Sequence, residues 1–260
     1  MYARLTGDDI AERVDGPLLF LRRTVDVGLN EAVEVESAEG GVRLGRIAAL
    51  DQDTVTVEML DDTAGLKLDG TRVRFFGQPL RFHVGPGLLG RVFDGIGKPL
   101  DGGPPLAAEH AYRVDGLPMK PSAREAPSEF LETGFTAIDL MNSLVRGQKL
   151  PLFSGGGLPH DRIAVDIACN ARIRAARGGA DDFAIVFAGI GIPHGSAEFV
   201  REEMEKSGAL ARTVLFLNLA SDSSAQRLLT PRFALTAAEY MAFEQGKHVL
   251  VILTDITNYC

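Results

Sequence analysis

The segment LPLFSGGGLPHD, residues 150–161, carries the clearest structural signal in this 260-residue chain. Four uncharged residues, 150–153, lead into three consecutive glycines, and the apolar residues Ile163, Ile167 and Ala171 follow at helical spacing. A strand, a glycine-rich turn and a helix in this order are typical of a loop in which backbone N–H groups and a helix N-terminus hold phosphate oxygens. We therefore expect a buried strand over residues 150–153 and an α/β domain of the nucleotide-binding type around it.

The loop keeps the glycines of a phosphate site but lacks the residues that usually hold phosphate and magnesium. Ser154 stands at the first glycine of the usual spacing G-x-x-x-x-G-K-[ST], and Pro159 stands at the last. His160 replaces the lysine, and Asp161 replaces the hydroxyl residue. Proline has no N–H to donate, and histidine carries much less charge at neutral pH than lysine. Because a unit charge pair ~4 Å apart is worth about 4 kcal/mol at an effective dielectric of about 20, we expect phosphate binding to be strongly weakened.

A second candidate lies after the apolar run over residues 248–254, which Asp255 follows directly. An aspartate in this place has the form of a Walker B element, whose carboxylate orients Mg²⁺. The same carboxylate is also typical of a helix cap or a solvated turn, just as consecutive glycines are typical of a tight turn. The weak nucleotide-binding candidates on the loop are Ser154, Gly155, Gly156, Gly157, Leu158, Pro159, His160 and Asp161.

The second half of the chain alternates short apolar runs with helical patterns. The further runs are residues 183–187, 213–217 and 249–253, and their continuous apolar character favours a parallel sheet buried on both faces. One helix is expected to begin after an N-cap at Gly195-Ser196 and to end at Gly208. A second is expected to end at Gly246 and not to extend backwards across Pro231. Its expected apolar stripe is Leu235, Ala238, Met241, Ala242 and Gln245.

The first half reads as a β module. Short runs with alternating apolar and polar residues occupy 32–36, 54–59, 72–75 and 80–84, with turn-forming residues between them. Such spacing favours a small β-barrel or sandwich. The domain boundaries expected from these patterns are 1–82 for an N-terminal β-barrel, 83–128 for a Gly/Pro-rich linker that wraps the next domain, and 129–260 for the α/β nucleotide-type domain.

Composition excludes several classes of function. Lys and Arg total 27 and Asp and Glu total 35, a net charge of −8, which disfavours non-specific nucleic-acid binding. The two cysteines cannot form a disulfide framework, and the five histidines show no metal-ligand spacing, so no metal site is expected. The N-terminus lacks the apolar centre of a secretory signal. The longest uncharged apolar run, residues 183–193, is too short to span a membrane.

Four long stretches, in order, closely resemble the B subunits of V/A-type rotary ATPases. They are LLGRVFDGIGKPLDGG (88–103), TGFTAIDLMNSLVRGQKLPLFSGGGLPHD (133–161), KSGALARTVLFLNLASD (206–222) and TPRFALTAAEYMAFEQGKHVLVILTDITNY (230–259). The resemblance implies a β-barrel followed by a degenerate P-loop-type domain. It also implies that Ile192 occupies the position of a glutamate that polarises the attacking water in catalytic relatives, and isoleucine cannot do this.

The resemblance further implies a non-catalytic, regulatory and structural role. Such a chain alternates with the catalytic A subunit in a hexameric ring, completes its ATP sites, contacts central-stalk and peripheral-stalk subunits, and lies peripherally on the cytoplasmic side of the membrane. No catalytic residue, metal or required cofactor is expected in the chain, with Mg·ATP or Mg·ADP held weakly or at the interface with the A subunit. The family's helical C-terminal domain and arginine finger lie beyond Cys260, so we expect a truncated chain.

Two other hypotheses remain open at this point. One is a module that binds ATP or ADP weakly as a regulatory ligand, because three glycines still offer backbone N–H groups. The other is a competent P-loop ATPase with an unconventional loop, in which His160 substitutes for lysine. The sequence decides neither the direction of the reaction nor whether the transported ion is H⁺ or Na⁺.

Overall fold

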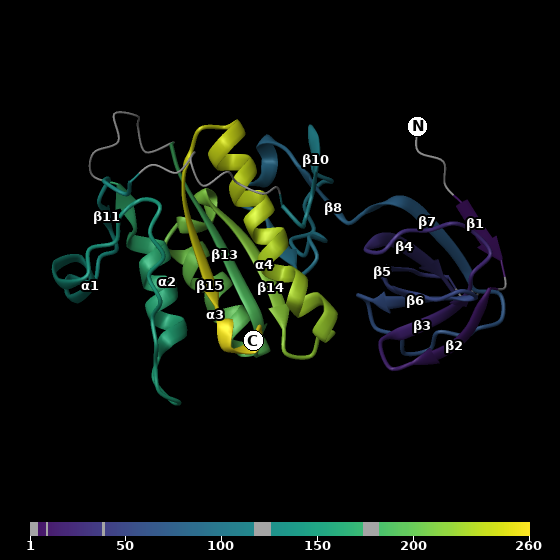
Figure 1. Ribbon diagram of the computed structural model, residues 1–260. Coiled ribbons are helices and arrows are strands. Elements are labelled where there is room, and N and C mark those ends of the chain that lie inside the picture. The colour runs from purple at the N-terminus through teal and green to yellow at the C-terminus, as the bar shows by residue number, and fades with distance from the viewer. Residues whose placement is uncertain (1–4, 9, 38–39, 117–125, 174–181) are drawn as a thin grey trace.

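The computed structural model describes residues 5–8, 10–37, 40–116, 126–173 and 182–260. Figure 1 shows two folded parts side by side, an antiparallel β part at the N-terminal end and an α/β part built from the rest. No helix in these ranges has the length and apolar character needed to cross a membrane.

The N-terminal part is a seven-stranded antiparallel sheet in the order β1-β7-β4-β5-β6-β3-β2. Its strands are β1 (Leu5–Asp8), β2 (Ala11–Asp15), β3 (Leu18–Arg22), β4 (Glu31–Glu36), β5 (Val42–Leu50), β6 (Thr54–Met59) and β7 (Arg72–Pro79). In β6 every second residue is buried, as the alternating sequence predicts. The inward residues share one core, in which Val33, Val57 and Phe75 are almost inaccessible. The strands expected over 32–36, 54–59 and 72–75 are therefore confirmed.

The Gly/Pro-rich segment is built into the α/β part. Its strand β9 (Val92–Asp94) pairs in parallel with β14, and β10 (His110–Arg113) pairs with β8 (Arg81–Val84), the strand expected over 80–84. A single 3-10 turn, η1 (Pro86–Leu88), stands between β8 and β9. The expected boundaries at 82 and 128 remain a prediction, and residues 117–125 lie outside the described residues.

The α/β part contains a parallel sheet in the order β15-β13-β14-β9. Its longer strands are β13 (Phe183–Ile192), β14 (Thr213–Leu219) and β15 (His248–Thr254), which contain the apolar runs expected at 183–187, 213–217 and 249–253. All ten residues of β13 are buried. Alternate residues of β13 join two different cores, because successive side chains point to opposite faces of a strand.

The helices cover both faces of this sheet (Figure 1). α2 (His160–Asn170) and α3 (His194–Lys206) pack on one face, and α4 (Ser224–Glu239), continued by the π-helical turn η5 (Tyr240–Glu244), packs on the other. The smaller elements are α1 (Thr136–Met141), β11 (Leu131–Glu132), β12 (Arg172–Ile173), η4 (Ala209–Arg212) and η6 (Ile256–Asn258).

The strand expected over residues 150–153 is not formed, so that prediction was wrong. These residues have no regular secondary structure, and Leu152 and Phe153 are 54% and 95% exposed. Pro151 has no N–H to give to a strand ladder, which weakens any pairing of so short a run. Among the described residues β15 forms the edge of the sheet and pairs with β13 alone.

Two helix predictions also need correction. α3 begins at His194 after Pro193, and Ser196 lies inside the helix instead of capping it. The predicted end is confirmed, since Gly208 follows the helix in the left-handed conformation. Pro231 lies inside α4, because the helix starts earlier, at the cap Ser223, and burial against the sheet outweighs the one hydrogen bond that proline removes.

The apolar stripe of α4 was only partly predicted. Ala238 and Met241 are buried, but Leu235 is 44% exposed. The buried face of α4 instead carries residues such as Leu229 and Phe233. Leu229 was not included in the expected stripe, because the helix was expected to begin only after Pro231.

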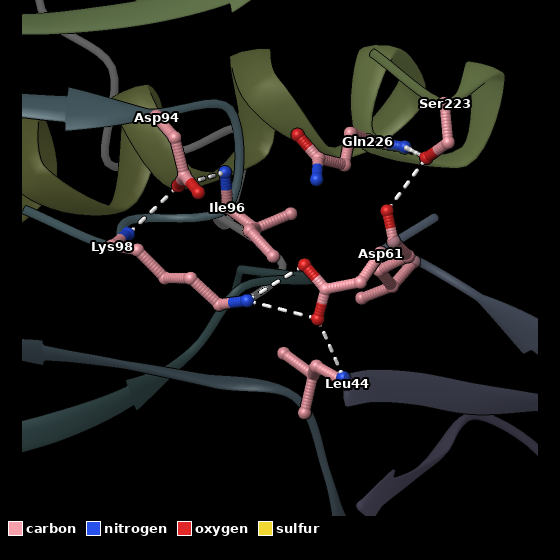
Figure 2. A network of polar contacts seen from close by, with 8 residues as sticks. Leu44, Asp61, Asp94, Ile96, Lys98, Ser223 and Gln226 are labelled. Carbon is pink, nitrogen blue, oxygen red and sulfur yellow. Dashed lines mark hydrogen bonds and ion pairs between the residues drawn. The ribbon is translucent and has the colours of Figure 1, made fainter. Parts of the chain in front are cut away.

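A polar network joins the β part to the α/β part (Figure 2). The Nζ atom of Lys98 lies 2.7 and 2.8 Å from the two carboxylate oxygens of Asp61, and Asp61 also accepts a 2.7 Å hydrogen bond from the backbone N–H of Leu44. Ser223, the cap of α4, donates to the carbonyl of Leu60 at 2.7 Å. We call these contacts the junction network. Leu60 is itself fully buried in the core under α4, so apolar and polar contacts hold the two parts together.

Candidate functional site

The candidate residues gather where the strands of the parallel sheet end. β13 ends at Ile192 and β15 at Thr254, and Gly189 is in register with Thr254. α2 and α3 begin at the same edge and are joined there by a hydrogen bond between Asp161 and Ser196. The carboxyl edge of a parallel sheet is where α/β proteins bind their ligands.

The glycine-rich loop is an exposed turn. Residues 154–160 are all exposed, Gly157 has a φ of +83°, and the N–H of Leu158 donates to the carbonyl of Gly155 at 3.3 Å. Helix α2 begins at His160 after Pro159, with no side chain capping it. The Nδ1 atom of His160 lies 3.0 Å from the carbonyl oxygen of Leu158, so the ring contacts the backbone of its own loop.

Both carboxylate oxygens of Asp161 contact other side chains of the protein. Its Oδ2 accepts a 2.8 Å hydrogen bond from the hydroxyl of Ser196 in the first turn of α3, and its Oδ1 lies 3.5 Å from Nε2 of His160. In a working phosphate loop a hydroxyl at this position holds Mg²⁺. The residues present therefore do not fit a magnesium triphosphate held in the usual way: Pro159 offers no N–H, and the Asp161 carboxylate places negative charge at the start of α2.

Ile192 is buried at the end of β13, with 3% of its surface exposed. It packs back onto the sheet, since a Cβ on Gly189 would lie 2.5 Å from Cδ1 of Ile192. The preceding backbone is fixed by side chains from elsewhere: the N–H of Gly191 donates to Asn218, and the amide of Asn258 donates to the carbonyls of residues 190 and 191. An apolar side chain in this position offers no group that could align a water molecule.

Asp255 caps a short helix. Its Oδ1 accepts a 2.9 Å hydrogen bond from the N–H of Thr257 at the start of η6. This is the helix-cap alternative considered for Asp255, and the Walker B role stays a prediction. Among the described residues no hydrogen bond or ion pair joins Asp255 to residues 154–161, and no group of three His, Cys, Asp or Glu side chains is placed to hold a metal ion.

Sequence reasoning missed the contacts of four residues that shape this edge. They are Ser196, Asn218, Arg227 and Asn258. The hydrogen-bond partners of Ser196, Asn218 and Asn258 here are 27 to 68 residues away along the chain, so no local spacing links them. Gly189 and Gly191 were the available signals, because a glycine that interrupts a buried apolar strand often marks a close approach.

Comparison with known proteins places these observations in a family. A model described as "ATP synthase alpha/beta family, nucleotide-binding domain" matches residues 134–260, and one described as "ATP synthase alpha/beta family, beta-barrel domain" matches residues 12–77. The B subunit of the A-type ATP synthase of Methanopyrus kandleri is 50% identical to this chain over 247 residues, which are 95% of this chain and 25% of that protein. The chain thus spans about a quarter of the length of this curated relative.

These matches confirm the fold class inferred from the sequence, a β-barrel followed by a nucleotide-type parallel α/β domain. They also confirm the resemblance to B subunits that the four motif stretches indicated. Since the two matches together cover more than half of the sequence, the chain belongs to the ATP synthase alpha/beta family and is a homologue of the B subunit of A-type ATP synthases.

Proposed function

We propose that this chain serves as the regulatory, non-catalytic B subunit of an A-type ATP synthase, a rotary machine that couples ATP synthesis to ion transport. In this role it alternates with the catalytic A subunit in a hexameric ring, completes the ATP sites of that subunit and contacts the stalk subunits. The ring is peripheral, on the cytoplasmic side of the membrane, and reaches the membrane only through the complex. The identity to the B subunit of an A-type ATP synthase supports this role.

The hydrogen bond between Asp161 and Ser196 carries the non-catalytic part of the proposal. It keeps a carboxylate at the N-terminus of α2, where phosphate groups would otherwise be attracted by the helix dipole. The buried, apolar Ile192 supports the same conclusion, since it supplies no base to activate water.

A weak regulatory nucleotide site is the second candidate function. Gly155, Gly156 and Gly157 are exposed, and they precede an 11-residue helix whose N-terminus favours anions. Mg·ATP or Mg·ADP bound at this loop, or at the interface with the A subunit, would then regulate the ring without being hydrolysed by this chain.

ATP turnover and calorimetric titration with Mg·ATP test the proposal. We expect no turnover above background and no saturable binding below millimolar Mg·ATP by the chain alone. A triple variant, Pro159→Gly with His160→Lys and Asp161→Thr, restores the last glycine, the lysine and the hydroxyl of the usual loop and should bind roughly 10³-fold more tightly. Turnover by the parent chain that collapses on Asp255→Ala would contradict the non-catalytic role, and saturable micromolar binding would favour the second candidate.

Ring formation needs a separate measurement. Native mass spectrometry of the chain mixed with the catalytic A subunit should show complexes that contain both chains in equal numbers. Complexes that contain only the catalytic chain would contradict the structural role, whatever the nucleotide titration shows.

A further inference from the structure

A groove of about 300 Å³ lies between α4 and the turn that follows β10. Its walls are residues 114–116 of the turn and, from α4, Arg232, Leu235, Thr236 and Glu239. The N–H of Gly116 donates to the carbonyl of Arg113 at 3.2 Å and closes the turn. Val114 is buried in the same core as the inner face of α4. Both walls therefore rest on one core, and the groove is part of the folded structure.

The two acids of the groove differ in their partners. Oδ1 of Asp115 lies 3.0 Å from Nη1 of Arg232, and its Oδ2 lies 3.6 Å from Nη2 of Arg113. Glu239 forms no hydrogen bond or ion pair with the described residues, although its Oε1 would lie only 3.9 Å from a Cβ on Gly116. Burial raises the pKa of Glu239 above its ordinary value. This carboxylate is therefore partly removed from water and keeps a charge that a cation from outside the chain can balance.

The groove belongs to an exposed stripe along α4. Leu228, Arg232, Leu235 and Glu239 are spaced four, three and four residues apart, so they share one side of the helix. Leu228 and Leu235 are 42% and 44% exposed, and Phe243 in the following turn η5 is 67% exposed. The stripe extends over roughly 20 Å at about 1.5 Å per residue. Apolar side chains exposed over such a length are typical of a surface that binds a protein and exceed what one small molecule covers.

We propose that this groove is a docking site for the neighbouring catalytic A subunit, which presents a lysine or arginine to Glu239 and an apolar side chain to Leu235. The proposal rests on the B-subunit role, in which each chain has a neighbour on either side in the ring. The aliphatic stem of a basic residue packs on apolar side chains while its charged end reaches a carboxylate. The ion pair of Asp115 and Arg232 forms a polar rim beside the apolar centre, as is usual in protein interfaces.

The affinity of the chain for the A subunit, measured by calorimetry, tests the docking site. Leu235→Asp should weaken binding by about 10-fold or more, because it places a charge where an apolar side chain is buried by the partner. Glu239→Gln should weaken it less than Glu239→Lys, since the lysine also repels the partner's cation. Both positions are exposed, so circular dichroism and urea denaturation should show variants as folded and nearly as stable as the parent.

Leu100→Asp and Glu202→Gln are the matched controls. Leu100 is 56% exposed and Glu202 lies on α3, and both are outside the groove and the stripe. Their variants should bind the A subunit like the parent. Folded Leu235→Asp and Glu239→Lys variants that bind as tightly as the parent would overturn the docking site and leave the B-subunit role standing. Absence of binding by the parent chain would contradict the B-subunit role itself, and the docking site with it.

Discussion

The junction network contains Asp61, and the start of α2, directly after the glycine-rich loop, contains Asp161; the two carboxylates have different partners. Asp61 and Asp161 are similarly buried, with 19% and 25% of their side chains exposed. Asp61 is paired with the ammonium of Lys98 through both oxygens. Asp161 accepts from the uncharged hydroxyl of Ser196, and its other oxygen lies 3.5 Å from Nε2 of His160. The charge of Asp61 is therefore balanced within the junction by Lys98. The carboxylate of Asp161 instead keeps a negative charge next to the loop where an active relative would hold phosphate.

The aromatic side chains near the two regions differ in burial. Phe82 in β8, close to the junction, is 4% exposed and contacts the rings of Phe93, Phe216 and Phe233 with centroids 5.5 to 5.7 Å apart. Phe153 at the loop is 95% exposed. The first region therefore stabilises the fold, and the second contributes little to it.

The largest expected effect comes from removing Phe82. Phe82→Ala should lower the free energy of unfolding by about 3–5 kcal/mol, because it removes a buried ring and leaves a cavity among three others. Phe153→Ala should change it by no more than about 0.5 kcal/mol. Urea denaturation of both variants measures the difference, and losses of similar size would show that the exposed position of Phe153 is not the one adopted in solution.

The next effect tests the ion pair of the junction. Lys98→Met should cost about 1–2 kcal/mol, since it leaves the half-buried Asp61 without its cation. Lys206→Met is the matched control. Lys206 pairs with Glu202 and Glu203 on the exposed face of its own helix, and only a small loss, within the range of surface helix pairs, is expected there. The comparison is made by urea denaturation at low salt, and equal losses for the two lysines would mean that the junction is held by apolar contacts alone.

The third prediction concerns the loop. Asp161→Ala and Ser196→Ala should each destabilise the chain by about 1 kcal/mol, and the double variant by less than their sum, because both remove the same hydrogen bond. A double-mutant cycle from the free energies of unfolding gives the coupling directly. Strict additivity would show that the contact between α2 and α3 is not formed in solution, and the Asp161 carboxylate would then be free to contact a magnesium ion.

The buried strands and the barrel were predictable because their pattern is local. Every residue of β13 is apolar or glycine, and the alternation in β6 follows the period of a strand. The strand at residues 150–153 failed although its composition is just as apolar, since burial requires neighbouring strands that a short run does not specify. Pro231 misled for a related reason, because the buried contacts of α4 override a local helix breaker.

The candidate site was predictable in its residue types and not in its contacts. The sequence places Pro159, His160 and Asp161 where they work against phosphate, and the structure adds that Asp161 is bonded to Ser196, 35 residues away. Arg227 could not be singled out beforehand, because an arginine in a helical pattern is ordinarily a solvated surface residue. Its stem lies over Gly191, a contact that only the three-dimensional arrangement shows.

The smallest expected effect is a pH dependence at the junction. Asp94 lies beside Lys98, and its carboxylate Oδ1 accepts hydrogen bonds from the backbone N–H groups of Ile96 and Lys98 (Figure 2). Burial raises the pKa of Asp94 above its ordinary value of 3.8, against the opposing effect of these hydrogen bonds and of the Lys98 charge. A raised pKa in the folded state means that the protonated form stabilises the fold. This contribution is complete below about pH 3.8 and is lost as the pH rises through the folded-state pKa.

Asp94→Asn keeps an oxygen acceptor for both N–H groups but cannot ionise. The variant should therefore be more stable than the parent chain at neutral pH, by less than the about 1 kcal/mol expected at Asp161, and the advantage should shrink as the pH falls toward 3.8. Asp101→Asn serves as a control in which the opposite effect is expected. The hydrogen bond from the Arg91 guanidinium lowers the pKa of Asp101, so removing the Asp101 charge should destabilise the chain at neutral pH. Urea denaturation between about pH 3 and 8 measures both variants. An Asp94→Asn chain that is less stable than the parent at neutral pH would show that the Lys98 charge, and not burial, governs this carboxylate.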